Sequence, residues 1–175
     1  MSNPACTLLR PGRKRIKRAV VVAVFFVLGR AMQSGSVLEH SIRREVAEWE
    51  EGFRVTMHVQ PAGPSMGWVK KQGRLKYLGR PETPADLSIN FKNLECAFVM
   101  LTPQVGLCQG FSEHRLSVSG DLARSISFVR CLNAILVILY PRWMASRLVK
   151  RLPPKPADLF QKRLHVYLMG IPFGR

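Results

Sequence analysis

The segment of residues 116–140 restricts the possible folds of this chain more than any other. It begins as a short apolar strand, turns at Gly120 and Asp121, and then continues without proline or glycine to Tyr140, after which a proline ends it. This order predicts a strand, a tight turn and a long helix. The first half of the helix has one apolar face, but every residue from 134 to 140 is apolar. The helix therefore needs a cover, which its own protein, a bound apolar molecule or a membrane could supply.

The middle of the chain alternates between apolar and polar residues, which predicts strands. Residues 53–59 and 87–91 show the period of two that a half-buried strand requires, and residues 68–77 fit a hairpin with its turn at Gly73. Asn93 is positioned to cap the apolar helix that follows. We expect an α+β fold in which a mainly antiparallel sheet is covered on one face by helices.

The charge of the chain is strongly unbalanced. Lysine and arginine number 27 against 11 acidic residues, a formal net charge of +16. The expected partners are therefore polyanions, either nucleic acid or the anionic face of a membrane. Two basic segments, residues 10–18 and 142–151, each adjoin apolar residues, which favours a membrane surface over nucleic acid. The predicted membrane-contact residues are Arg13, Lys14, Arg15, Lys17, Arg18, Arg142, Trp143, Arg147, Lys150 and Arg151.

An apolar run of residues 19–28 follows the first basic segment and is interrupted at Gly29 and Arg30. As a helix, this run would be about 15 Å long, roughly half of a bilayer core, so we do not expect it to span a membrane. Three interpretations stay open: a secretory signal, a shallow membrane anchor and a packed helix. The expected location is cytoplasmic with peripheral attachment to a membrane, the secretory signal being the alternative.

The sequence offers little for catalysis. The histidines are scattered, and the chain has no HExxH pair, no GxSxG elbow and no phosphate-binding glycine loop. Glu113, His114 and Asp121 could meet as an acid/base group, but only their proximity in the sequence suggests it. The four cysteines form no CxxC pair, so we expect reduced, mostly buried thiols and a reducing compartment. We therefore expect a protein that is not an enzyme and that uses no metal or cofactor.

Four stretches of the chain carry a resemblance to a known family. They are residues 85–89, the apolar helix of residues 94–101, Phe111, and the strand and Gly-Asp turn of residues 116–122. Together they resemble the sterol carrier domain, the α+β fold of small lipid carriers. The resemblance covers roughly residues 37–150, and His114 stands where members of the family usually carry glycine. The chain is also similar to bacterial accessory factors of isoprenoid quinone synthesis that contain this domain.

The resemblance implies an apolar cavity, a tunnel between a curved sheet and its helices that holds a sterol, a fatty acyl chain or another lipid. The expected tunnel wall consists of Phe53, Val55, Ile89, Phe91, Leu94, Phe98, Leu101, Leu122, Ile126 and Val129. Each of these residues also fits an ordinary core position, because apolar spacing alone does not separate the two. The predicted function is non-catalytic binding or carriage of a hydrophobic molecule at an anionic membrane surface. The alternatives are an accessory factor that holds a hydrophobic intermediate for biosynthetic enzymes, and a basic nucleic-acid-binding protein.

We expect three parts along the chain: a basic and apolar N-terminal segment (1–36), a lipid-binding domain (37–152) and a C-terminal tail (153–175). The domain is expected to open with an amphipathic helix over residues 37–49. Ser36 and Glu39 would form the capping box of this helix.

Overall fold

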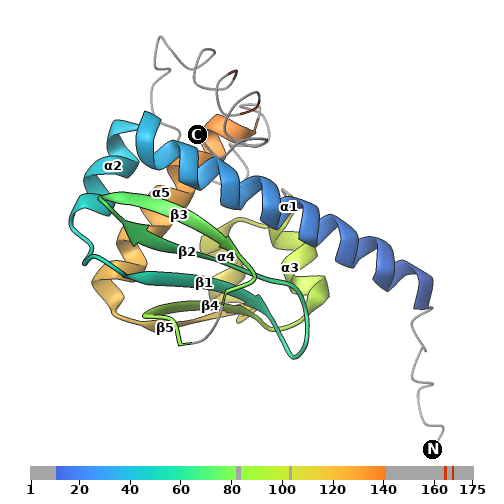
Figure 1. Ribbon diagram of the computed structural model, residues 1–175. Helices are drawn as coiled ribbons and strands as arrows, with labels where there is room; N and C mark the ends of the chain where they lie inside the picture. Colours follow the sequence, from blue (N-terminus) through green and yellow to red (C-terminus); the bar gives the residue numbers. More distant parts are fainter. Residues whose placement is uncertain (1–10, 82–83, 103, 141–163, 165–166, 168–175) are drawn as a thin grey trace, which may run out of the picture.

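The computed structural model describes residues 11–81, 84–102, 104–140, 164 and 167, with the side chains of 11–13, 107 and 108 excepted. In these residues, helices lie against a five-stranded sheet (Figure 1). The elements are α1 (Pro11–Leu38), α2 (His40–Ala47), β1 (Arg54–Val59), β2 (Ser65–Lys71), β3 (Arg74–Gly79), β4 (Leu87–Phe91), α3 (Leu94–Leu101), α4 (Leu107–Ser112), β5 (Leu116–Gly120) and α5 (Leu122–Leu139).

The sheet has the strand order β3-β2-β1-β4-β5 and is mixed. β1 and β2, β2 and β3, and β4 and β5 pair antiparallel, whereas β1 and β4 pair parallel. The prediction of an antiparallel meander is therefore wrong at the centre of the sheet. Alternating apolar residues determine which face of a strand is buried, but not which strand lies beside it. The predicted β2–β3 hairpin is confirmed, with Gln72 and Gly73 both at positive φ in its turn.

One face of the sheet carries the core. Ile89 of β4 is buried, while its neighbours Ser88 and Asn90 are only half-buried, as alternation along a strand requires. The helices α1 and α5 lie over the apolar face (Figure 1), where the ring of Phe128 packs on that of Trp68 with centroids 5.5 Å apart. The helical cover that the apolar strands required is therefore present.

The segment that constrained the fold most has the predicted structure, as β5 and α5. Gly120 has a φ of +133°, and a Cβ there would press against β4, so the turn requires glycine. The side chain of Asp121 accepts a hydrogen bond from the backbone N–H of Arg124 at 2.8 Å and so caps α5. Asn93 caps α3 in the same way, through the N–H of Cys96 at 2.9 Å.

The first helix differs from its prediction. α1 has 28 residues, a length of about 42 Å, where the apolar run indicated ten. Its residues Val21, Phe25 and Leu28 belong to the same core as α5 and the sheet, so α1 is part of the domain. The boundary predicted at residue 36 falls inside this helix.

Gly29 was expected to interrupt the N-terminal helix, but it lies within α1 at a point of close approach. Its carbonyl accepts a hydrogen bond from Trp68 Nε1 at 3.0 Å. A Cβ at this position would overlap the ring of Tyr77. The glycine therefore lets α1 lie directly on β2 and β3.

The capping box predicted at the start of the domain is wrong. α1 continues to Leu38, and Glu39, at the N-cap of α2, makes no capping hydrogen bond with its side chain. Ser36 instead serves the edge of the sheet: its Oγ accepts the backbone N–H of Leu75 on β3 at 3.2 Å. The Oε1 of Gln33 accepts the N–H of Tyr77 at 2.9 Å. These bonds satisfy edge N–H groups that would otherwise be open to another strand.

Two described helical segments, Lys14–Leu38 and Leu122–Leu139, have the length and apolar composition of a membrane span. Within the protein, 50% of the first window and 33% of the second are buried. A core helix and an N-terminal signal meet the same criterion, so length and composition alone do not place either segment in a membrane. The expectation that the N-terminal run is too short to span rested on a ten-residue helix and does not hold for α1.

Candidate functional site

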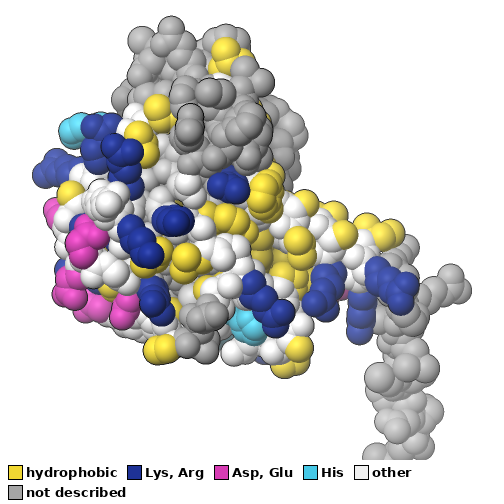
Figure 2. All heavy atoms as spheres, in the orientation of Figure 1, with side chains coloured by type: hydrophobic (Ala, Val, Ile, Leu, Met, Phe, Trp, Pro, Cys, Tyr) yellow, Lys and Arg dark blue, Asp and Glu magenta, His cyan; other side chains and the backbone are white. Residues whose placement is uncertain are grey.

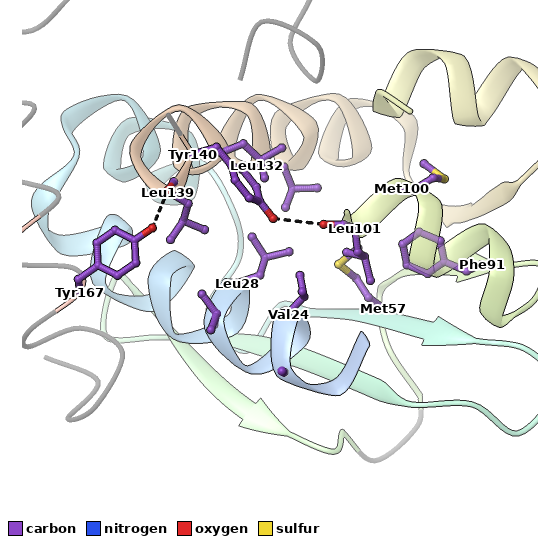
Figure 3. Close-up of a pocket in the computed structure, with 13 residues that line it drawn as sticks. Val24, Leu28, Met57, Phe91, Met100, Leu101, Leu132, Leu139, Tyr140 and Tyr167 are labelled. Atoms are coloured by element: carbon purple, nitrogen blue, oxygen red, sulfur yellow. Dashed lines mark hydrogen bonds between the residues drawn. The ribbon is translucent and has the colours of Figure 1, made fainter. Parts of the chain in front are cut away.

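A partly enclosed apolar cavity of about 200 Å³ lies between the helices and the sheet. Its wall comes from α1, α3 and α5 with single residues of β1 and β4, and the labelled side chains surround a common space (Figure 3). The lining residues are Ala23, Val24, Val27, Leu28, Met57, Phe91, Met100, Leu101, Leu132, Leu136, Leu139, Tyr140 and Tyr167. Apart from two tyrosine hydroxyls, all of these side chains are apolar.

The α1 contribution to the wall follows from helical geometry. Val24 and Leu28 are four residues apart, as are Ala23 and Val27, so the four side chains form one stripe of the helix. The apolar pattern of this run predicted a signal, an anchor or a packed helix, and not a cavity wall. Its only signal in the sequence was its unbroken apolar character.

The two tyrosine hydroxyls are engaged at helix ends. Tyr140 donates a hydrogen bond to the carbonyl of Leu101 at 3.2 Å, and Tyr167 donates to the carbonyl of Leu139 at 2.6 Å (Figure 3). These carbonyls belong to the last residues of α3 and α5, where helices leave acceptors without an intrahelical partner. Burial raises the pKa of Tyr140, and the nearby Tyr167 adds to this rise, so the hydroxyl of Tyr140 stays protonated. The sequence analysis did not single out either tyrosine.

The two carboxylates of the acid/base group considered from the sequence have other hydrogen-bond partners. The carboxylate of Asp121 caps α5, as described above. The carboxylate of Glu113 accepts hydrogen bonds from Gln109 Nε2, at 2.7 Å, and from Arg115. The hydrogen bond from Arg115 is the main cause that lowers the pKa of Glu113. Both carboxylates therefore have structural partners. Among the described residues, no three His, Cys, Asp or Glu side chains gather in a way that could hold a metal ion.

Two of the cysteines are free thiols in the interior, and the side chain of Cys108 is not among those described. Cys96 and Cys131 are both buried. Burial is the main cause that raises the pKa of the Cys131 thiol, to about 12, and the charge of Glu45 adds to the shift. A thiol of this kind is neutral at physiological pH and a poor nucleophile. Cys6 lies outside the described residues, and the reducing compartment stays a prediction.

The structure distributes the predicted tunnel wall over several places. Phe91 and Leu101 line the cavity. A second, more open groove of about 500 Å³ is lined by four further predicted residues, Ile89, Leu122, Ile126 and Val129. Leu94 lines a separate depression beside the β1–β2 turn.

The other three predicted wall residues have different neighbours. Val55 is fully buried in the core. Phe53 packs against Trp49 with ring centroids 5.4 Å apart, and the ammonium of Lys17 lies 5.5 Å from the ring centre of Phe98. Contact of any of the ten residues with a ligand stays a prediction. Their dispersal shows that apolar spacing alone does not tell which residues share one cavity.

The first basic segment lies on the part of α1 that projects beyond the sheet (Figures 1 and 2). Lys14, Arg15 and Arg18 are exposed, whereas Lys17 forms an ion pair with Glu95 of α3. The side chain of Arg13 is not among those described. The second predicted group, Arg142, Trp143, Arg147, Lys150 and Arg151, lies outside the described residues.

Exposed apolar side chains run along the same helix. Ile16 is 68% exposed, and Val22 and Phe26 are 49% and 43% exposed. Figure 2 shows apolar and basic side chains side by side at the projecting end of α1. Basic residues beside exposed apolar ones suit an anionic membrane surface, and on α1 the two kinds are not sharply separated around the helix.

Comparison with known proteins gives likenesses of structure. No protein-family model and no curated protein matches the chain. A UbiJ-SCP2 ubiquinone synthesis protein matches with a TM-score of 0.44 and 17% identity, over 69% of this chain and 98% of its own. A conserved hypothetical protein of Thermus thermophilus, described as a possible sterol carrier protein, matches with a TM-score of 0.45 and 14% identity. The match covers 76% of this chain and 90% of that protein.

A third solved structure, the sterol carrier protein 2 like 2 of Aedes aegypti, matches with a TM-score of 0.31 and 15% identity, over 56% of this chain and 96% of its own. The solved structures to which the chain is similar include sterol carrier proteins and a ubiquinone synthesis protein, the two groups that its sequence motifs resemble.

Proposed function

We propose that this protein binds a lipid-like hydrophobic molecule non-covalently in the cavity between α1, α3, α5 and the sheet. The observation that carries the proposal is a cavity in which every lining side chain among the described residues is apolar except two tyrosines, whose hydroxyls already bond to helix ends. The described part of this wall is suited to apolar groups, because each buried methylene contributes about 0.8 kcal/mol.

The place of α1 supports a role at a membrane surface. Ala23 is exposed and also lines the cavity, so the exposed stripe of α1 reaches the cavity wall. If Ile16 and Phe26 enter the interface while Lys14 and Arg18 contact anionic head groups, the cavity lies next to the bilayer. A hydrophobic molecule would then pass between bilayer and cavity over a short path. The proposed location is cytoplasmic, with peripheral attachment to an anionic membrane.

The narrower role predicted from the sequence, an accessory factor that holds an isoprenoid quinone intermediate for biosynthetic enzymes, is one form of this proposal. It requires the same cavity and adds partner proteins. Extraction of the bound molecule from the purified protein separates the two: a quinone precursor, together with co-purifying enzymes, supports the accessory role. A mixture of ordinary acyl lipids without such enzymes supports general carriage.

The direct test is native mass spectrometry of the purified protein, followed by titration with a fluorescent fatty acid. Val24→Trp fills the cavity from α1, and Val22→Trp places the same side chain on the exposed side of the same helix. We expect a bound adduct and probe uptake in the native protein, about tenfold weaker uptake in Val24→Trp, and native uptake in Val22→Trp.

Two results would count against the proposal. If the native protein carries no adduct and takes up no fluorescent fatty acid, it is not a lipid binder. If both tryptophan variants weaken uptake equally, the ligand does not occupy the cavity. Retention on DNA that falls steeply with salt, without any lipid uptake, would favour the nucleic-acid alternative.

A further inference from the structure

Arg30 of α1 lies over two aromatic rings. Its guanidinium carbon is 5.7 Å from the ring centre of Phe26, one turn earlier on the same helix, and 5.8 Å from that of Tyr77 on β3. The two rings meet edge to face, with their centroids 6.2 Å apart. Cation–π contacts with two rings restrict a long side chain that would otherwise take many rotamers. The guanidinium is therefore held in place before any ligand binds.

The backbone around this arrangement is fixed as well. Gly29, next to Arg30, lies so close to Tyr77 that a Cβ would overlap the ring, and its carbonyl accepts a hydrogen bond from Trp68 Nε1 at 3.0 Å. On β3, the N–H of Tyr77 donates to Gln33 Oε1 at 2.9 Å. The guanidinium is thus carried by rigid elements, which position a binding group more accurately than loops do.

The positive charge of Arg30 has no counter-charge in the described part of the chain. No described carboxylate forms an ion pair with it, whereas Lys17, another half-buried cation of α1, pairs with Glu95. Burial raises the pKa of the Tyr77 hydroxyl, and the charge of Arg30 opposes this rise. The hydroxyl is therefore neutral at physiological pH and does not balance the charge of the guanidinium.

The nitrogens of Arg30 differ in what they can still bind. Nε is closed off from solvent and has no hydrogen-bond acceptor among the described residues. A buried donor without an acceptor is unusual in native proteins and destabilises them. The terminal nitrogens are not closed off in this way, and the residue as a whole is half-buried. An anion can therefore approach them from solvent and balance the charge that the guanidinium shares with Nε.

Arg30 also continues the exposed side of α1. It follows Phe26 by four residues and Ala23 by seven, so the three side chains share one face of the helix. Phe26 is 43% exposed, and Ala23 is exposed and lines the cavity. When an apolar side chain enters a membrane interface, an arginine beside it lies at the level of the head groups.

We propose that Arg30 is a binding site for one phosphate group, supplied by the head group of an anionic membrane lipid. This inference rests on the membrane-surface role in the proposed function, and it names the residue and the chemical group through which α1 docks. A planar guanidinium offers parallel N–H donors to two phosphate oxygens, which a lysine ammonium cannot do. The exposed Lys14 and Arg18 contribute charge near the surface, whereas Arg30 is held in one geometry by the two rings.

The test keeps the net charge constant. In Arg30→Lys the positive charge stays but the planar pair of donors is lost, and Arg74→Lys makes the same change at an exposed position of β3. Flotation measures binding to vesicles of phosphatidylcholine and phosphatidylglycerol, with pure phosphatidylcholine vesicles as the reference without net charge. We expect Arg30→Lys to bind the anionic vesicles about tenfold more weakly than the native protein does. Arg74→Lys should bind them as the native protein does.

The outcomes separate the phosphate site from the proposed function. If the native protein binds no anionic vesicles, the membrane-surface role fails, and the site fails with it. If the native protein and both variants bind these vesicles equally, Arg30 is not a phosphate site, while the membrane-surface role stands. The same conclusion follows if both variants lose affinity to the same extent.

A second measurement uses the native protein and does not depend on how Arg30→Lys folds. Phenylglyoxal modifies accessible guanidinium groups, and mass spectrometry gives the extent of modification at each arginine. We expect anionic vesicles to protect Arg30 while Arg74 stays reactive, and pure phosphatidylcholine vesicles to protect neither. Equal reactivity of Arg30 with and without anionic vesicles would overturn the site.

Glycerol phosphate in solution distinguishes the two possible sources of the phosphate group. At the same total concentration of phosphate, it should protect Arg30 less than the anionic vesicles do, because the contact of Phe26 with the bilayer is then missing. Protection as complete as that by vesicles would show that a free phosphate ester suffices, and it would overturn the lipid head group as the ligand.

Discussion

At position 114 a histidine holds a backbone conformation that favours glycine. Its φ is +53°, in the left-handed region where the Cβ of an L-residue crowds the neighbouring carbonyl. The chain turns here from the end of α4 into β5, and the N–H of His114 donates to the carbonyl of Phe111 at 3.0 Å. The family that the sequence resembles usually has glycine at this point. The left-handed backbone conformation that glycine adopts easily is thus present, and histidine adopts it at a higher energetic cost.

His114→Gly should therefore stabilise the protein, by about 0.5–1 kcal/mol, because relief of the left-handed strain exceeds the added entropy of the unfolded chain. Chemical denaturation of the native protein and the variant measures the difference. His58→Gly, on strand β1, is the control, since it should destabilise the protein. An unchanged or lower stability of His114→Gly would show that the histidine side chain contributes more than its backbone conformation costs.

The thiol of Cys131 should make stability depend on pH in the alkaline range. Burial raises its pKa from 9.0 to about 12, so the folded protein holds this proton where the unfolded chain releases it. The contribution is present below about pH 9 and is lost as the pH rises from 9 to 12. In that window the free energy of unfolding of the native protein should fall by about 1.4 kcal/mol per pH unit more than that of Cys131→Ala. Equal slopes from denaturation curves between pH 9 and 11 would contradict this assignment.

At the scale of elements, the position of α1 on the sheet depends on two residues in contact. Gly29 leaves room for the ring of Tyr77. The guanidinium of Arg30 lies over this ring, and Phe26 meets it edge to face, so the ring cannot easily move aside. Gly29→Ala should destabilise the protein by about 1–3 kcal/mol, although alanine favours helices. In a Tyr77→Ala background the same change should be neutral or stabilising. Thermal and chemical unfolding measure the loss of stability that Gly29→Ala causes in each background. An equal loss in both would show that the two residues are not coupled.

Sequence reasoning succeeded where an element is determined by its own residues. The Gly120-Asp121 turn, the cap at Asn93 and the β2–β3 hairpin depend on residues close in the chain, and each forms as predicted. The parallel pairing of β1 with β4 depends on which strand β4 joins after β3, and no local pattern encodes that choice. The length of α1 was missed for a related reason: the glycine that looked like a break is tolerated because tertiary contacts require it.

The candidate site was harder to predict than the fold. The sequence marked the apolar half of α5 as needing a cover, and Leu132 and Leu136 do face the cavity. The opposite wall comes from α1, more than 90 residues earlier in the chain, and its side chains are as apolar as any core residue. Whether an apolar side chain packs or borders a space depends on the volume left between elements. That volume is not a property of a single element.

For the whole molecule, the net charge of +16 would attract any polyanion. A membrane surface and a nucleic acid differ in how they use that charge. Nucleic acid binding depends on total neutralised phosphates, whereas an interfacial helix needs basic residues beside apolar ones. Of the described acidic residues, Glu95 pairs with Lys17 of α1, whereas Glu48, Glu50 and Glu51 follow the end of α2, away from the projecting end of α1 (Figure 1). The charge of the molecule is therefore unevenly placed, and its position can be tested separately from its sum.

Two triple variants with the same net charge make this test. The combination Lys14→Glu, Arg15→Glu and Arg18→Glu changes the projecting end of α1, and Lys71→Glu, Arg74→Glu and Lys76→Glu changes the β2–β3 hairpin. Because each basic residue near an anionic surface contributes about 1 kcal/mol, the α1 variant should bind anionic vesicles about a hundredfold more weakly. The hairpin variant should bind them nearly as the native protein does. If vesicle flotation shows equal losses in both variants, the attraction follows the total charge, and α1 has no special place at the membrane.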